Sequence, residues 1–249
     1  MGVRSITRPT LQAERASAVP EREVSASPRP RLGGMPAQHI HLVRHGEVHN
    51  PEHVLYGRLD GFGLSDLGHR MAAASADAFH EQGVPVRAVV ASPLQRTRES
   101  AVPWSSAFGL ETQVDERLIE PSNKYEGRRS DFTIAKQLKV PAEWPWIVNP
   151  LKPSWGEAYV SIAARMLSAV DEAWSSVDEG DVVLVSHQLP IWMVHRSVTG
   201  ARLFHDPRRR RCTLSSITTL ERREGGFVEV GYQEPAAHLN QSAVDLGAV

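Results

Sequence analysis

The sequence predicts an α/β fold, a three-layer α/β/α sandwich with a mostly parallel central sheet. Short apolar runs that indicate buried strands alternate with longer segments of helical periodicity along the 249 residues. Two of these runs, residues 39–44 and 181–185, are followed closely by a histidine, His45 and His187 respectively. Because ligands bind at the carboxyl ends of the strands in open α/β sheets, both histidines are expected at a functional site.

The first half of the chain contains two strand–helix units and a third short strand. Residues 39–44 are expected to form the first strand. A helix follows over 65–82, with a serine as its N-cap and a glycine just beyond its end. Residues 86–91 are expected to form the second strand. The next helix is expected from about Pro93, since proline suits the first turn, and residues 111–114 form the third strand.

The second half continues the alternation of helices and strands. A long amphipathic helix over 157–177 precedes a strand over 181–186 and a helix that begins after Pro190. Two further strands are expected over 212–220 and 227–232, the last of them at an edge of the sheet. This alternation favours the three-layer sandwich.

Three segments lie outside this pattern. Residues 1–37 are rich in Arg, Pro, Ser and Ala, so we expect a disordered leader, with Met35 as an alternative start. Residues 121–155 are irregular and contain tryptophans, and they are expected to form a lid-like insertion over the open end of the sheet. The histidine-bearing α/β domain would then span 38–235, and residues 236–249 would form a C-terminal tail.

Composition and charge exclude several classes of protein. The formal net charge of −1 carries no signature of nucleic-acid binding, although arginines outnumber lysines by 24 to 4. Cys212 is the only cysteine, so neither an intrachain disulfide nor a thiolate metal cluster is possible. No apolar run approaches the ~18 residues of a membrane helix. We therefore expect a cytoplasmic protein without a membrane or nucleic-acid partner, and its oligomeric state is open.

Four short motifs carry the functional prediction. In chain order they are Leu42-Val43-Arg44-His45-Gly46-Glu47, Ser92-Pro93-Leu94-Gln95-Arg96, Leu118-Ile119-Glu120 and Ser186-His187. In this order and at this approximate spacing they resemble the histidine phosphatase, or phosphoglycerate mutase-like, superfamily over about residues 39–220. A lone Arg-His-Gly would be weak support, whereas four motifs in the family's order are strong support.

The resemblance implies a role for each polar residue of the motifs. His45 is the nucleophile that becomes a phosphohistidine, and Arg44, Arg96 and His187 surround the transferring phosphoryl group. Glu120 protonates the leaving oxygen and then activates the water that hydrolyses the intermediate. The implied partner is a small phosphorylated substrate, and no metal ion or other cofactor is implied.

The same assignment agrees with the chemistry of these residue types. An attacking imidazole must be neutral at the attacking nitrogen, with its other nitrogen held by an acceptor. Phosphoryl transfer requires positioning and fixed positive charge around the equatorial oxygens, which arginines supply without a metal ion. An alkoxide leaving group needs a proton, which a carboxyl of raised pKa can donate.

The chain departs from the family's usual pattern at two places. Val48 stands where the family has threonine or serine, and the family's asparagine comes one residue early, as Asn50. The stretch after Glu120 is shorter than usual, so Glu116 and Glu126 are alternative proton donors. The residues expected to contact the substrate are Asn50, Arg58 and Gln188.

A histidine-rich stretch allows a competing interpretation as a metal site. Its members are His39, His41, His45, His49 and His53. A glycine and a proline break the helix that would align histidines four residues apart, which argues against a metal. Alternation along a strand places His39 and His41 on one face, and we expect them to be an edge or surface pair.

Two further features have a plain and a functional interpretation. The basic run Arg208–Arg211 is expected to be a solvated loop, but it could line the mouth of the site and attract a multiply anionic substrate. Cys212 lacks the arginine six residues later that a cysteine-based phosphatase requires, because position 218 is threonine. It is expected to be a buried, inert thiol.

The favoured function is a metal-independent phosphomonoester hydrolase of the histidine acid phosphatase type that acts through a phosphohistidine. Two alternatives keep the same fold: a phosphoglycerate mutase-like phosphotransferase and a non-catalytic phospho-ligand-binding protein. The intact set of Arg44, His45, Arg96 and His187 favours an enzyme. A nucleic-acid binder would rest on the arginine run alone.

Overall fold

The computed structural model describes residues 2, 36–129, 139–144 and 156–245. The chain divides into two compact units, Met1–Gly33 and Gly34–Val249, and every helix and strand named below belongs to the second. The expected leader with Met35, and much of the expected lid with Trp146 and Trp155, lie outside the described residues. The domain boundaries therefore stay predictions.

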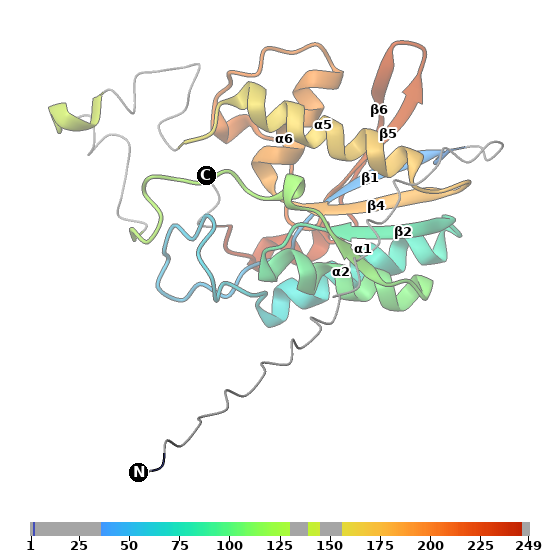
Figure 1. Cartoon of the computed structure of the whole chain (residues 1–249), viewed down its shortest axis with the longest axis horizontal. Helices are drawn as coiled ribbons and strands as arrows, with labels where there is room; N and C mark the ends of the chain where they lie inside the picture. Colours follow the sequence, from blue (N-terminus) through green and yellow to red (C-terminus); the bar gives the residue numbers. More distant parts are fainter. Residues whose placement is uncertain (1, 3–35, 130–138, 145–155, 246–249) are drawn as a thin grey trace. The chain divides into compact units, whose positions relative to one another are not determined.

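A six-stranded sheet forms the centre of the described part of the second unit (Figure 1). Its spatial order is β3-β2-β4-β1-β5-β6. The first four of these run parallel to one another, whereas β5 and β6 are antiparallel to their neighbours. The mostly parallel sheet expected from the sequence is confirmed. The strands are β1 His39–Arg44, β2 Val86–Ala91, β3 Thr112–Val114, β4 Asp181–Ser186, β5 Ile217–Arg223 and β6 Gly226–Gln233.

Helices cover both faces of the sheet, with α1 and α2 on one face and α5 and α6 on the other (Figure 1). This arrangement confirms the three-layer sandwich. No helix among the described residues is long and apolar enough to cross a membrane. The longer helices are α1 Asp66–Glu81, α2 Gln95–Phe108, α5 Tyr159–Ser175 and α6 Gln188–Val198. Short 3-10 helices are η1 Glu116–Leu118, η2 Pro141–Glu143, η3 Pro207–Arg209 and η4 Ala237–Ser242.

Alternation of side chains along β1 builds two apolar cores. Ile40 and Leu42 pack in the core under α5 and α6. Val43 packs in the core under α1 and α2, where the rings of Phe79 and Trp104 meet edge to face with centroids 5.3 Å apart. Because β1 is an interior strand buried on both faces, its carboxyl end is held rigidly, and so are the side chains that follow it.

Two helices begin at other residues than those expected. The helix expected from Pro93 begins at Gln95. The helix expected after Pro190 begins at Gln188, so the proline lies within its first turn. A proline is tolerated there because the first N–H groups of a helix have no intrahelical partner.

The fifth strand also starts later than expected. Residues 212–216 form a loop, and the strand begins only at Ile217. Ser215 has a φ of 55°, a left-handed conformation that interrupts an extended strand. The loop instead bonds to the end of β1: the N–H of Ser215 donates to the carbonyl of His45 and the N–H of Arg44 donates to the carbonyl of Ser216. This loop therefore forms one wall of the region where the motifs meet.

Candidate active site

His45 and His187 lie side by side at the carboxyl ends of β1 and β4. The two strands are parallel neighbours with Arg44 opposite Ser186, so the residue after each strand emerges at the same edge of the sheet. The backbone N–H of His45 donates to the carbonyl of Ser186 at 3.1 Å. The two imidazole rings have centroids 5.3 Å apart. The fold therefore brings together two histidines that are far apart in the chain.

His45 is buried, and one hydrogen bond fixes its tautomer. Its Nδ1 lies 2.7 Å from the carbonyl oxygen of Gly46, and because a carbonyl only accepts, Nδ1 must carry the proton. Nε2 is then the nitrogen with a free lone pair. Burial, followed by the charges of Arg96 and Arg44, holds the pKa of His45 well below its usual value. The ring therefore has the neutral state that a nucleophile needs.

Two glycines in close contact set the path of the chain after His45. A Cβ on Gly46 would lie 2.3 Å from the carbonyl oxygen of Gly68, in the first turn of α1. A Cβ on Gly68 would lie 2.0 Å from the carbonyl oxygen of Glu47. Only glycine at both positions allows the loop to lie against the helix. Ser65 strengthens this junction, since its hydroxyl accepts from the N–H of Gly68 and donates to the Glu47 carboxylate.

Arg44 ends β1 and is fully buried. Its Nη1 donates to the carbonyl of Cys212 at 2.7 Å. Nη1 and Nη2 also donate to the two carboxylate oxygens of Asp245, at 2.8 and 2.5 Å. Burial disfavours the charge, but the carboxylate of Asp245 raises the pKa of Arg44 above its usual value. Nothing in the sequence pattern pointed to Asp245, which lies in the predicted C-terminal tail.

Arg96 approaches from the first turn of α2 and is buried. Its Nη2 donates to the carbonyl of Gly57 at 2.8 Å, and its Cζ lies 4.8 Å from the centroid of the Tyr56 ring. Burial raises the pKa of the Tyr56 hydroxyl to about 12, so the phenol stays protonated. Tyr56 was missed by sequence reasoning, and its place directly before Gly57 was the only sign of it.

His187 is the N-cap residue of α6 and is fully buried. Its Nε2 bonds to the hydroxyl of Ser92, which follows β2, at 2.8 Å. Its Nδ1 lies 3.7 Å from Oε2 of Glu120. Burial, and then the charge of Arg96, holds the pKa of His187 well below its usual value, so this ring is neutral as well. Residues that follow three adjacent strands thus converge here.

Glu120 follows η1, which is tied to β4 by a 2.7 Å hydrogen bond from Ser186 Oγ to the carbonyl of Leu118. The carboxyl is buried, and burial raises its pKa against the opposing charges of nearby arginines. A raised pKa favours the protonated carboxyl, which is the form that a proton donor requires. The two alternatives differ: Glu116 is exposed, and Glu126 accepts hydrogen bonds from two backbone N–H groups. Of the three, Glu120 is the one beside the histidines.

The three residues expected to contact the substrate each bond within the protein. The amide of Asn50 bonds to both backbone groups of Val54 and lines a pocket of about 210 Å³. Arg58 donates from Nε to the carbonyl of Glu120 at 2.5 Å. Gln188, the first residue of α6, is half-buried directly after His187. Their contact with substrate stays a prediction.

Four buried polar atoms in this cluster have no hydrogen-bond partner within the part of the chain that the structure describes. They are Nε of Arg44, Nε of Arg96, Oε1 of Glu120 and Nδ1 of His187. Buried polar atoms in proteins are nearly always bonded, so four of them together indicate a polar ligand. Two of the four are permanent donors on guanidinium groups, which suits an anion with several oxygens.

A second polar cluster lies at the other ends of β1 and β4. Ligand atoms of His39, His41 and Asp181 lie within 4.8 Å of one another, so these residues could hold a metal ion. Both nitrogens of His41 are already bonded, however, to Asp181 at 2.9 Å and to the hydroxyl of Thr219 at 3.0 Å. The expectation of an edge or surface pair was wrong, because β1 is an interior strand and His41 is buried.

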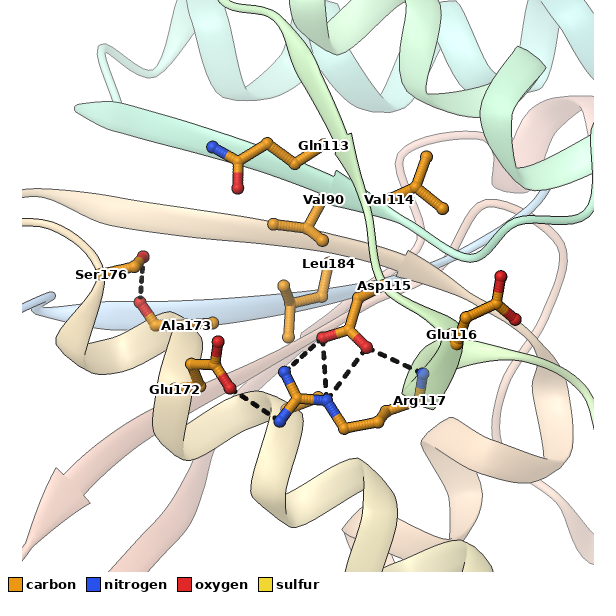
Figure 2. Close-up of a pocket in the computed structure, with 11 residues that line it drawn as sticks. Val90, Gln113, Val114, Asp115, Glu116, Arg117, Glu172, Ala173, Ser176 and Leu184 are labelled. Atoms are coloured by element: carbon orange, nitrogen blue, oxygen red, sulfur yellow. Dashed lines mark hydrogen bonds and ion pairs between the residues drawn. The ribbon is translucent and has the colours of Figure 1, made fainter. Parts of the chain in front are cut away.

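A separate pocket of about 320 Å³ lies between α5 and the segment after β3 (Figure 2). Its main charged group is Arg117, which bonds to Asp115 and Glu172 at 2.6 and 2.8 Å. The carboxylates neutralise this arginine, as the dashed lines of Figure 2 show. None of the motif histidines lines the pocket. The pocket therefore has no part in the chemistry of the histidine cluster.

A neutral nucleophile between buried arginines, with a carboxyl of raised pKa nearby, is an arrangement suited to phosphoryl transfer on an α/β sandwich. A comparison with known protein families agrees with this assignment to phosphoryl transfer. The model of the histidine phosphatase superfamily (branch 1) matches residues 40–235. The chain belongs to this superfamily, and the resemblance drawn from the four motifs is confirmed.

Individual relatives differ in what their names say. An uncharacterized protein of Mycobacterium tuberculosis, Rv0525, is 49% identical over 198 residues, which cover 80% of this chain and 96% of that protein. The probable phosphoglycerate mutase GpmB of Yersinia pestis is 27% identical over 218 residues, with 83% and 97% covered. Among solved structures, a mycobacterial glucosyl-3-phosphoglycerate phosphatase, Rv2419c, aligns with a TM-score of 0.60 at 25% identity, covering 79% of this chain and 96% of the other.

Proposed function

We propose that this protein is a phosphomonoester hydrolase of the histidine acid phosphatase type, with a phosphohistidine intermediate on His45 and no metal ion. The observation that carries the proposal is the tautomer of His45. Its Nδ1 proton is held by the Gly46 carbonyl at 2.7 Å, which leaves the Nε2 lone pair available beside two buried arginines.

The first step forms a bond between Nε2 of His45 and phosphorus, and breaks the bond between phosphorus and the leaving oxygen. Arg44, Arg96 and His187 donate hydrogen bonds to the phosphoryl oxygens as charge moves onto them. Burial raises the pKa of Glu120, which favours the protonated carboxyl that gives its proton to the leaving oxygen.

The second step returns the enzyme to its starting state. Water attacks phosphorus and the bond from phosphorus to Nε2 of His45 breaks. Glu120, now a carboxylate, takes a proton from that water and recovers its acid form. Inorganic phosphate leaves, so atoms and charge balance over the cycle without a metal ion or other cofactor.

Rapid mixing with a ³²P-labelled phosphomonoester tests this proposal. Quenching without acid should trap protein-bound label that is acid-labile and alkali-stable, as a phosphohistidine is. His45→Ala should lose both label and phosphate release. The matched control is His49→Ala, because His49 lies in the same loop but is exposed. Normal turnover by a folded His45→Ala protein would overturn the proposal.

A mutase-like phosphotransferase is the second candidate, and the similarity to the probable phosphoglycerate mutase GpmB favours it. It would use the same first step but return the phosphoryl group to a bound hydroxy compound instead of water. GpmB and the mycobacterial phosphatase Rv2419c are both named for phosphoglycerate compounds, so phosphoglycerates are suitable test substrates. Following labelled phosphate from 3-phosphoglycerate distinguishes the two, since a hydrolase releases inorganic phosphate and a mutase yields an isomeric phosphoester.

A further inference from the structure

Three polar side chains meet at the amino ends of β1 and β4, at the end of the sheet opposite the motif histidines. Nδ1 of His39 and Nε2 of His41 both face Oδ2 of Asp181, at 3.3 and 2.9 Å. His39 and His41 lie two residues apart on one strand, so both project from the same face of the sheet. Asp181 joins them because it is the first residue of β4, the parallel neighbour of β1. Two adjacent interior strands thus direct three potential metal ligands to one point.

The distances between these atoms suit the coordination of a single ion. In a tetrahedral zinc site with bonds of about 2.0–2.1 Å, neighbouring ligand atoms are about 3.3 Å apart. The three ligand atoms of the cluster lie within 4.8 Å of one another, and the two separations from Oδ2 of Asp181 are close to that spacing. Two imidazole nitrogens and one carboxylate oxygen are also a set of ligands that Zn²⁺ accepts in proteins.

The carboxylate of Asp181 needs a compensating positive charge. Its side chain is only 4% exposed, and its ion-pair partners among the described residues are His39 and His41. Histidine is mostly uncharged above about pH 7, so these partners leave a buried negative charge largely uncompensated. A divalent cation supplies the missing charge, whereas neutral rings supply only hydrogen bonds.

Neighbouring groups hold two of the ligands in place. The backbone N–H of His39 donates to Oδ1 of Asp181 at 3.1 Å, which orients the carboxylate. On the far side of the His41 ring, Nδ1 lies 3.0 Å from the hydroxyl of Thr219, the residue directly opposite on β5. Histidines that bind a metal almost always donate their other ring N–H to an acceptor, and the Thr219 hydroxyl is placed for that role.

The hydrogen bonds that His41 makes are compatible with metal binding. An ionised carboxylate only accepts, so the metal-free ring carries its proton on Nε2, and Nδ1 accepts from the hydroxyl of Thr219. When Nε2 binds an ion, the ring proton moves to Nδ1 and the hydroxyl accepts it, because a hydroxyl can bond in either direction. The ring stays neutral, and both of its nitrogens keep a partner.

We propose that His39, His41 and Asp181 bind one Zn²⁺ ion, with water in the fourth position beside His39. The side chain of His39 is 37% exposed, whereas that of His41 is 5% exposed, so the ion enters past His39. The site is separate from the catalytic cluster, because β1 spans about 16 Å from His39 to Arg44. The ion joins β1 to β4 and stabilises the fold, and it takes no part in phosphoryl transfer.

Zinc binding to the tag-free, chelator-treated full chain tests the proposal. Competition with a chromophoric chelator should show one equivalent of Zn²⁺ bound with a submicromolar dissociation constant. His39→Gln should weaken binding at least roughly 10-fold, since losing even a supporting residue of a metal site has an effect of that size. This variant leaves the buried members of the cluster in place. The matched control is His69→Gln, which removes an exposed histidine from α1 and should bind Zn²⁺ like the wild type.

Thermal unfolding provides a second measurement. Zn²⁺ at about 100 times its dissociation constant should raise the Tm of the wild type by roughly 5–10 °C, because the ion binds the folded state. Thr219→Val, which keeps the shape of the side chain but removes the hydroxyl, should weaken zinc binding roughly 10- to 100-fold. Neither measurement requires turnover, so both are independent of the proposed function. Zinc binding that survives His39→Gln, no binding at micromolar Zn²⁺, or a Tm unchanged by Zn²⁺ would overturn the proposal.

Discussion

Asp245 forms a two-point ion pair with Arg44, the residue directly before the proposed nucleophile. Its two carboxylate oxygens lie 2.8 and 2.5 Å from the two Nη atoms of Arg44. The neighbouring N–H of Val244 donates to Glu47 at 2.6 Å, which holds the tail against the loop after β1. The Arg44 side chain is fully buried, whereas that of Asp245 is 39% exposed, so the carboxylate approaches from the solvent side.

Asp245→Asn should therefore tighten the binding of phosphate. The carboxylate and a phosphoryl group compete for the same guanidinium, and removing the negative charge removes the competitor. We expect the inhibition constant of inorganic phosphate to fall by roughly 2- to 10-fold, because a half-exposed ion pair is weak. Steady-state inhibition measures it. Asp206→Asn is the control, since Asp206 pairs with the exposed Arg208. Weaker phosphate binding by Asp245→Asn would show instead that Asp245 positions Arg44 for catalysis.

Glu120→Gln should slow hydrolysis in proportion to how much the leaving oxygen needs a proton. With an alkyl phosphate as substrate, the first-turnover rate of Glu120→Gln should be roughly 10²- to 10⁴-fold lower than that of the wild type, as is typical of general acid catalysis. With p-nitrophenyl phosphate the same rate should fall far less, because nitrophenolate leaves without a proton. Single-turnover measurements with both substrates compare the two losses. Glu116→Gln, at an exposed position, should change neither, and equal losses for both substrates with Glu120→Gln would assign Glu120 a structural role.

The stability of the protein should fall as the pH is lowered from neutrality. His187 is neutral in the folded protein because its pKa is held well below 6.5, whereas the unfolded chain binds a proton near that pH. The unfolded state then carries more protons, and acid favours it. His187→Gln removes this difference and should reduce the slope of unfolding free energy against pH, between about pH 5 and 6.5, by roughly 1 kcal/mol per pH unit. Urea denaturation at several pH values measures the slope, and an unchanged slope would mean that His187 is protonated in the folded protein.

Exhaustive chelation should leave phosphate release unchanged. Two buried arginines supply the positive charge that a metal ion supplies in other phosphoryl-transfer enzymes. The assay compares chelated and untreated protein at equal ionic strength. A large loss of activity, restored by one divalent ion and abolished by Asp181→Asn, would instead assign the metal site to the cluster of His39, His41 and Asp181.

Local patterns in the sequence predicted the parts of the site that local structure determines. The apolar runs that became β1 and β4 deliver His45 and His187, and a strand-to-helix turn delivers Arg96. A buried strand is recognisable from its own residues, and the position after it follows directly.

Residues that join the site through tertiary contacts could not be predicted in this way. Asp245 reaches Arg44 through the path of the tail, and Tyr56 reaches Arg96 from a loop. The start of β5 was misplaced because Cys212 and Leu214 are apolar, yet they are buried by a loop that turns at Ser215. Apolar character predicts burial, and the backbone conformation that achieves it depends on the rest of the fold.

The position of the phosphoryl group on the imidazole of His45 tests the central claim most directly. Phosphorylated protein can be trapped by rapid quenching under alkaline conditions, and the modified peptide identified by mass spectrometry. Heteronuclear NMR then distinguishes phosphorus on Nε2 from phosphorus on Nδ1. Because Nδ1 donates its proton to the Gly46 carbonyl at 2.7 Å, phosphorus should be found on Nε2 of His45 alone. Phosphorus on Nδ1, on His187 or on no histidine would contradict the mechanism.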